Sequence, residues 1–118
     1  NISEPHSQDF GIDINERTFK ILSNRCFCIS DSVSSLEEEV YTNDEVVFVK
    51  SPSEFQDRVN HFIENPDDRV GYIERGYNTV ISKHTYFHRA SQIFSELGLK
   101  KEASDCNRSL GYFLENSP

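Results

Sequence analysis

The residues best suited to chemistry lie at the start of a helix that Asn15 is expected to cap. Arg17 and Thr18 follow in its first turn. Backbone N–H groups and the helix dipole at such a start suit a diphosphate. A guanidinium could add a bidentate hydrogen bond to that group, and a hydroxyl could add another. By residue type alone, a surface cation and a capping accessory are the simpler explanations of Arg17 and Thr18.

Lys20 lies three residues after Arg17, so the two cations are expected on one face of this helix. Positive charge near a helix N-terminus is unfavourable without an anion, in a chain that is otherwise acidic. We hypothesise that this face receives phosphate. The rival explanation is an i, i+4 ion pair between Lys20 and Glu16, which is worth only about 0.3–0.5 kcal/mol at an exposed site.

Two further polar tips follow predicted strands, at Ser30-Asp31-Ser32 and at Lys50-Ser51. Ser30 and Asp31 could contact ribose or sugar hydroxyls. Equally, Asp31 could only cap the next helix, which is the simpler explanation for that residue by itself. The sequence has no glycine-rich phosphate loop and no nucleophile elbow.

No metal site is predicted. Cys26 and Cys28 lie two apart and would share one face of a strand, but no second pair or matching histidine spacing accompanies them, so buried thiols are expected. His84 and His88 have the i, i+4 spacing that can share a metal. The glutamate-bearing zinc motif is absent, however, and capping and packing explain both histidines.

Two continuous apolar runs, Cys26–Ile29 and Val46–Val49, are typical of parallel strands covered on both faces. Between them, Ser34 and Glu37 form a capping-box pattern that predicts a short helix to about Tyr41. Strands that alternate with helices predict an α/β fold. We expect a partial Rossmann-like parallel sheet of two to three strands, the third at the extreme N-terminus, with flanking helices and a helical C-terminal tail. Ligands then belong at the carboxyl ends of the strands.

Helices are expected to fill the rest of the chain. Ser51-Pro52-Ser53-Glu54 is a strong helix start, and Asn65-Pro66 ends that helix. Gly71 and Gly76 weaken the next helix by about 1 kcal/mol each relative to Ala, so close packing against a neighbour is expected to require them. Two later apolar stripes predict two more helices: Tyr86, Ala90, Ile93, Phe94 and Leu97, then Ala103, Cys106, Leu110 and Phe113.

The composition argues against several classes of protein. The 118 residues carry a formal charge of −8, whereas a general nucleic-acid binder needs a basic footprint, and an anionic membrane surface would repel the chain. No stretch has the length of a membrane span, and no cationic-then-apolar leader is present, so we expect a cytoplasmic protein. Because the sequence opens on Asn1 and contains no Met, we expect it to be part of a longer protein.

Several landmarks follow one another in a characteristic order, and in that order they resemble the glycosyltransferases of the two-Rossmann GT-B fold. The resemblance runs from about Asn1 to Leu99 and is strongest to the branch of spore-coat and spore-maturation glycosyltransferases. The residues that carry it are Asn1-Ile2-Ser3, Asn15-Glu16-Arg17-Thr18-Phe19, Phe27-Cys28-Ile29-Ser30-Asp31, Ser53-Glu54-Phe55, Asn65-Pro66, Arg69, Gly76, and His84-Thr85-Tyr86 with Arg89.

The resemblance implies part of an enzyme that transfers a sugar from a nucleotide-sugar donor to an acceptor. The chain would be a single domain over 1–118, the second half of the donor-binding C-terminal Rossmann domain, with a donor-side part at 1–50 and a helical part at 51–118. The N-terminal acceptor domain would lie upstream. No cofactor is implied besides the nucleotide-sugar substrate. Arg17 and the helix start at Asn15 would contact the donor diphosphate.

Two positions depart from the family pattern. Lys20 stands where a Glu usually binds the nucleotide ribose, and a Lys cannot accept hydrogen bonds from the two ribose hydroxyls. Asn24-Arg25 replaces the usual pair of a small residue and Gly. Two hypotheses therefore stay open: a part of a glycosyltransferase, or a non-catalytic glycosyltransferase-like module for binding or assembly. In isolation the chain is expected to be inactive and to self-associate through uncovered edges and apolar faces.

Overall fold

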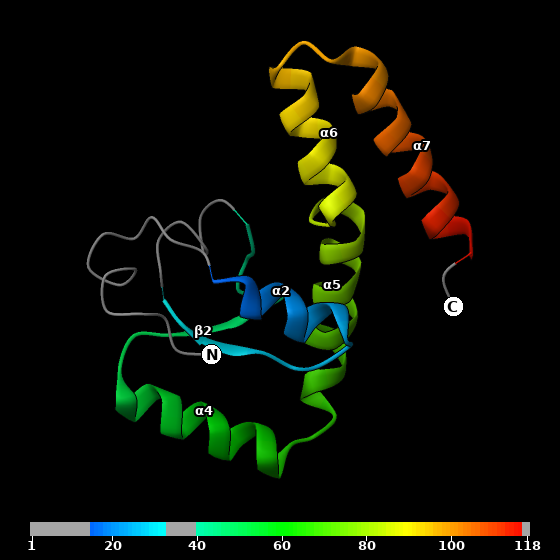
Figure 1. Ribbon diagram of the computed structural model, residues 1–118. Helices are drawn as coiled ribbons and strands as arrows, with labels where there is room; N and C mark the ends of the chain where they lie inside the picture. The colour runs from blue at the N-terminus through cyan, green and yellow to red at the C-terminus, as the bar shows by residue number, and fades with distance from the viewer. Residues whose placement is uncertain (1–14, 33–39, 117–118) are drawn as a thin grey trace. The chain divides into compact units, whose positions relative to one another are not determined.

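The computed structural model describes residues 15–32 and 40–116. The chain divides into two compact units, Asn1–Thr79 and Val80–Pro118, which we describe separately. Figure 1 shows the elements in chain order. They are α2 (Glu16–Ser23), β1 (Ile29–Asp31), β2 (Val47–Val49), α4 (Pro52–Glu64), α5 (Asp68–Lys83), α6 (Tyr86–Glu96) and α7 (Lys100–Asn116).

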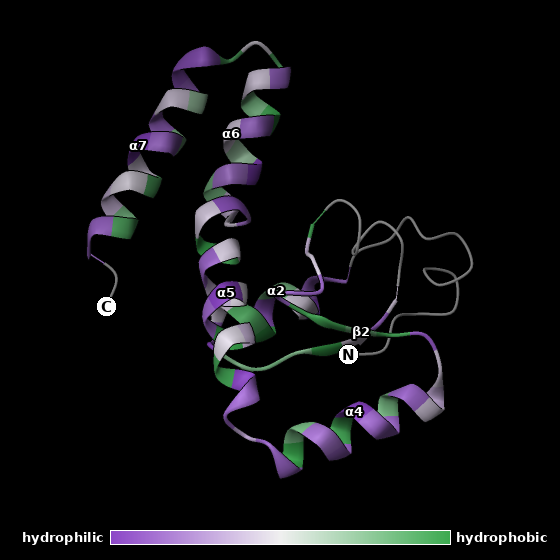
Figure 2. Ribbon diagram, turned by 180° about the vertical axis from the view of Figure 1, so that it is seen from behind, coloured by the Kyte–Doolittle hydropathy of each residue, from purple (hydrophilic) through white to green (hydrophobic). Residues whose placement is uncertain are grey.

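The sheet of unit 1 consists of β1 and β2, which pair in parallel as the sequence predicted. Asp31 lies opposite Val49, and the ladder continues beyond it because the Ser32 N–H donates to the Val49 carbonyl at 2.9 Å. Figure 2 shows β2 as hydrophobic, whereas α4 alternates between hydrophobic and hydrophilic residues. The parallel α/β architecture is confirmed. The expected N-terminal strand and the helix expected from Ser34 fall largely on residues 1–14 and 33–39, outside the described residues.

The first strand begins later than predicted, at Ile29 rather than Cys26. The cause is the way α2 ends. The Cys26 N–H donates to the Ile21 carbonyl at 3.2 Å, and the Arg25 N–H donates to the Leu22 carbonyl at 3.0 Å. These two bonds form a Schellman motif, whose residue after the cap takes a left-handed conformation. That residue is Arg25, with φ of 52°. Residues 26–28 then lead from this motif into β1.

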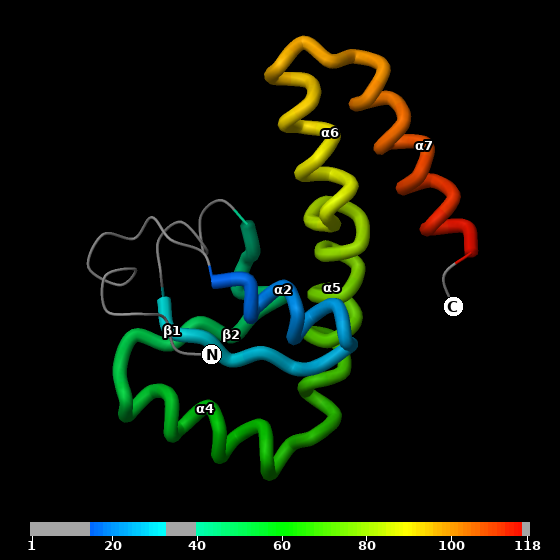
Figure 3. Tube along the Cα trace, viewed as in Figure 1, coloured from blue at the N-terminus to red at the C-terminus, as the bar shows by residue number. Residues whose placement is uncertain are grey.

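The carboxyl ends of the strands and the start of α2 lie at the same edge of unit 1. Figure 3 shows α2 beginning on the side where β1 ends, and α4 begins on that side as well. This arrangement follows from chain direction, because α2 runs back along the sheet before β1 starts. The edge is the place where an open α/β sheet binds its ligands.

Gly76 of α5 marks the closest approach between elements of unit 1. A Cβ atom built there would lie 2.7 Å from Cδ2 of Leu22 in α2 and 3.3 Å from the Glu45 carbonyl oxygen. Leu22 is fully buried, so it has no room to withdraw. The expectation that packing requires Gly76 is confirmed. For Gly71 it is wrong, because a Cβ there would approach only the end of the Arg75 side chain on the same helix.

Polar contacts surround this close approach and join α5 to the turn that precedes β2. The Arg75 Nε donates to the Asp44 carbonyl at 2.7 Å, and the Thr79 hydroxyl donates to a carboxylate oxygen of Glu45. The other carboxylate oxygen of Glu45 accepts from the Thr42 N–H at 2.8 Å. The turn is therefore fixed to α5 by both backbone and side-chain groups.

Arg25 makes two further contacts with α5, to residues that flank Gly76 in sequence. Its guanidinium pairs with Glu74 at 3.2 Å and lies 3.9 Å from the centre of the Tyr77 ring. The left-handed backbone of a non-glycine residue costs about 1 kcal/mol or more, and these two contacts offset that cost. We call Leu22, Arg25, Glu45 and the α5 residues Glu74–Thr79 the Gly76 seam.

Unit 2 is a helical hairpin of α6 and α7 that follows the last turn of α5. Gly98 makes the turn between the helices with φ of 74°, and the Ser91 hydroxyl donates to the Ala103 carbonyl at 3.3 Å. The two helices expected from the later apolar stripes are present, and Tyr86, Ile93 and Leu97 of the first stripe are exposed. Unit 2 therefore presents an apolar surface, to which Leu99, Tyr112, Phe113 and Leu114 also contribute.

Substituting the two glycines of α5 separately tests the packing at the Gly76 seam. Gly71→Ala should leave stability unchanged or raise it by up to about 1 kcal/mol, the helix-propensity gain. Gly76→Ala gains the same propensity but overpacks a rigid contact, so it should be less stable than Gly71→Ala by about 1–3 kcal/mol. Urea unfolding followed by circular dichroism measures both. Equal stabilities of the two variants would show that Gly76 is not in close contact.

Substituting Arg25 separates backbone strain from side-chain contacts. Arg25→Ala and Arg25→Gly both remove the ion pair with Glu74 and the contact with the Tyr77 ring, but only Gly relieves the left-handed backbone. Arg25→Gly should therefore be more stable than Arg25→Ala by about 1 kcal/mol. Thermal and urea unfolding of the two variants check this order. An Ala variant as stable as the Gly variant would mean that the backbone at position 25 is not strained.

Candidate functional site

The predicted helix start is present as α2. Asn15 is its N-cap, with an extended backbone, and the Asn15 Oδ1 accepts from the Arg17 N–H at 2.8 Å. The Arg17 side chain is exposed. Thr18, in contrast, has 0% of its surface exposed, so it belongs to the core beneath the helix start. The structure therefore presents Arg17 to solvent and uses Thr18 to anchor the turn that carries it.

Lys20 has a partner on its own helix. Its Nζ lies 2.5 Å from Oε1 of Glu16, at the i, i+4 spacing that the sequence offered as the rival explanation. Both side chains are more than 60% exposed (63% and 67%), so the pair contributes only a few tenths of a kcal/mol. The positive charge of Lys20 therefore does not by itself require a bound anion.

Ser30 and Asp31 lie inside β1 rather than on a tip beyond it, which corrects their predicted place. Ser30 is fully buried, and its hydroxyl donates to Oδ1 of Asp31 at 3.4 Å. Asp31 is half-buried at the last position of the strand, opposite Val49. Of this pair, Asp31 is the residue that reaches the carboxyl edge of the sheet.

The second tip, at Lys50-Ser51, begins α4 as predicted. The Ser51 hydroxyl accepts from the Glu54 N–H at 3.1 Å, and Pro52 is the first residue of the helix. The Glu54 carboxylate reaches back to the Lys50 N–H at 2.9 Å, one residue before the cap. These two bonds satisfy two backbone donors, and they hold the Glu54 carboxylate against the chain at the end of β2.

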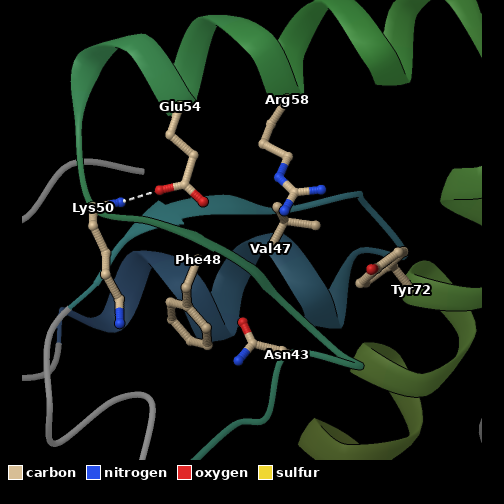
Figure 4. Close-up of a pocket in the computed structure, with 7 residues that line it drawn as sticks. All are labelled: Asn43, Val47, Phe48, Lys50, Glu54, Arg58 and Tyr72. Carbon is tan, nitrogen blue, oxygen red and sulfur yellow. Dashed lines mark hydrogen bonds between the residues drawn. The ribbon is translucent and has the colours of Figure 1, made fainter.

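A cavity that the sequence analysis did not predict lies next to this tip. It has a volume of about 330 Å³ and opens along β2 (Figure 4). The sequence signal that could have indicated this cavity is the four-residue spacing of Lys50, Glu54 and Arg58. The remaining walls come from β2, from the turn before it and from α5. The lining residues are Asn43, Val47, Phe48, Lys50, Glu54, Arg58 and Tyr72.

His84 and His88 both contact neighbouring polar groups within the fold. Nδ1 of His88 accepts from the Thr85 N–H at 3.2 Å in the capping box of α6, and Nδ1 of His84 lies 2.8 Å from an Arg89 nitrogen.

Cys26 is exposed, which corrects its predicted burial, whereas Cys28 is buried as expected. Burial raises the pKa of the Cys28 thiol because it disfavours the thiolate. Among the described residues, no three His, Cys, Asp or Glu side chains gather as metal ligands.

Within residues 15–32 and 40–116, no helix combines the length and the apolar composition that crossing a bilayer needs.

Comparison with known proteins identifies the family. A family model described as glycosyl transferase-like matches residues 1–95, which include α2, both strands, α4, α5 and nearly all of α6. No curated protein and no solved structure matches the chain. The matched region contains the whole carboxyl edge of the sheet and leaves α7 outside. The chain is therefore a member of the glycosyl transferase-like family.

Proposed function

We propose that the chain forms the donor-binding part of a glycosyltransferase, which transfers a sugar from a nucleotide-sugar to an acceptor bound by another part of the protein. The observation that carries the proposal is the capped start of α2 at the carboxyl edge of a parallel sheet, inside the family match. The N–H groups and the dipole of a helix start in general favour a diphosphate. The resemblance to GT-B enzymes supports the same assignment.

The residues of the proposed site divide into those that touch the donor and those that position them. Arg17 is exposed and would bind the diphosphate through its guanidinium. Asp31 reaches the edge of the sheet and would accept hydrogen bonds from sugar or ribose hydroxyls. Asn15, Thr18 and Ser30 would position these groups, because Asn15 caps the helix and the other two are buried.

A non-catalytic binding or assembly module is the second candidate function. The observation in its favour is the Lys at position 20, which pairs with Glu16. Position 20 therefore offers no carboxylate to hold the ribose. The exposed apolar residues of unit 2 support self-association of such a module. The two candidates differ in turnover, because both allow nucleotide-sugar binding but only the enzyme hydrolyses or transfers the sugar.

Replacing Arg17 tests the donor site. Binding of uridine, guanosine and thymidine diphosphate sugars to the intact protein is measured by calorimetry. Arg17→Ala should weaken the binding of the donor that fits by about 1.5–3 kcal/mol, the scale of a charged hydrogen bond. Arg108→Ala, on α7 and outside the family match, is the matched control and should bind as the unchanged protein does. Circular dichroism checks that both variants remain folded.

Two results would contradict the proposal. The first is nucleotide-sugar binding that Arg17→Ala leaves unchanged. The second is an equal loss of binding in Arg17→Ala and Arg108→Ala, which would indicate a general effect of net charge instead of a contact at the start of α2.

A further inference from the structure

The cavity beside β2 combines a polar interior with two cations. Lys50 lines it from the residue after β2, and Arg58 lines it from the second turn of α4, with their side chains on different sides of the β2 trace (Figure 4). Among the described residues, neither side chain has an ion-pair or hydrogen-bond partner. Both lie in a chain whose formal charge is −8, so each would be expected to find a carboxylate.

Glu54 lies midway between the two cations in sequence, but its carboxylate is used elsewhere. Its Oε2 accepts from the Lys50 backbone N–H at 2.9 Å, as part of the start of α4. Figure 4 shows Glu54 between Lys50 and Arg58, with the dashed line running to the backbone nitrogen of Lys50. The cap therefore holds this carboxylate away from the two cationic groups and leaves the charge of the lining at one positive unit, from two cations and one anion.

The backbone of β2 adds a further donor. The Val47 N–H donates to the Cys28 carbonyl at 3.1 Å, and the Val49 carbonyl accepts from the Ser32 N–H, so Val47 and Val49 direct their backbone groups toward β1. In a parallel ladder the residue between them directs its N–H and C=O to the opposite side. That residue is Phe48, which lines the cavity. Its N–H is therefore available on the edge of β2 that pairs with no other described strand.

Two walls of the cavity are held by contacts within unit 1. The Tyr72 ring packs edge-on against Phe27 and Phe62, each at 5.7 Å between ring centres. Asn43 belongs to the turn that Arg75 and Thr79 fasten to α5. A volume of about 330 Å³ is at the lower end of the range for small-molecule sites. The exposed side chains of Lys50 and Arg58 would become ordered around a ligand, which costs conformational entropy.

We propose that this cavity is an oxyanion site, in which Lys50, Arg58 and the Phe48 N–H bind the phosphate or carboxylate group of a small polar ligand. The guanidinium supplies directional hydrogen bonds, the ammonium supplies a compact charge, and the backbone N–H supplies a neutral donor. Tyr72 and Phe48 offer apolar contact to the rest of the ligand. The site is independent of the proposed donor site at the start of α2.

Titration with inorganic phosphate and, separately, with acetate tests the proposal on the ¹⁵N-labelled full chain by NMR. Saturable shifts are expected at the amides of Phe48, Lys50 and Arg58. Arg58→Ala and Lys50→Ala should each weaken binding roughly fivefold to tenfold, which is below the full range for a charged hydrogen bond because the cavity is open to solvent. Lys101→Ala on α7 is the control and should change binding less than twofold.

Glu54→Gln provides a test with the opposite sign. It keeps an oxygen that can accept the Lys50 N–H but removes the negative charge from the cavity, so the oxyanion should bind roughly twofold to fivefold more tightly. A preference for phosphate or for acetate identifies the ligand group, and either preference supports the site. The proposal is overturned if neither anion gives saturable shifts at these amides, if the shifts appear only in the first turn of α2, or if Arg58→Ala and Lys101→Ala bind alike.

Discussion

The close contact between α5 and α2 at Gly76 is the constraint on which the rest of unit 1 depends. Without a Cβ at this position, α5 approaches the fully buried Leu22 and the carbonyl of Glu45. The contact fixes α2 against α5 and fixes the turn before β2 against both. The start of α2 and the cavity beside β2 both belong to elements that this seam holds, so the positions of both sites depend on it. Overpacking the seam would displace the walls of the sites without touching a ligand.

Three carboxylates of unit 1 are used within the fold, two of them in the Gly76 seam and one at the start of α4. Glu45 joins the turn to α5, Glu54 completes the start of α4, and Glu74 balances Arg25 beside its left-handed backbone. A carboxylate held in this way satisfies a local donor and is no longer positioned to neutralise a cation elsewhere. The net charge of the chain is therefore a poor guide to the local charge at the carboxyl edge of the sheet.

The sequence predicted those features whose causes are local. The caps at Asn15 and Ser51 each need only a few neighbouring residues, and the parallel sheet follows from two apolar runs separated by a helical pattern. The start of β1 was misplaced because Arg25 occupies the left-handed position of the Schellman motif, where the usual sequence signal is glycine. Gly71 and Gly76 look alike in sequence, and only the packing of α2 against α5 distinguishes them.

Long-range contacts account for the part of the candidate site that the sequence did not predict. The cavity exists because Asn43, in the turn before β2, and Tyr72, in α5, come together as its walls. The burial of Thr18 and Ser30 likewise depends on how the elements pack. The assignment of Arg17 and Asp31 to a donor site remains a prediction, supported by the capped helix start, by the edge of the sheet and by membership of the glycosyl transferase-like family.

The most direct test of the central constraint is a double-mutant cycle between Gly76 and Leu22. Leu22→Val removes the two Cδ atoms that a Cβ at position 76 would meet and leaves the Glu45 carbonyl oxygen at 3.3 Å. Gly76→Ala should therefore cost at least about 1 kcal/mol less in the Leu22→Val background than in the unchanged protein. The free energy of urea unfolding measures all four corners of the cycle. If the cost of Gly76→Ala is the same in both backgrounds, Leu22 and Gly76 are not in close contact, and the account of unit 1 given above is wrong.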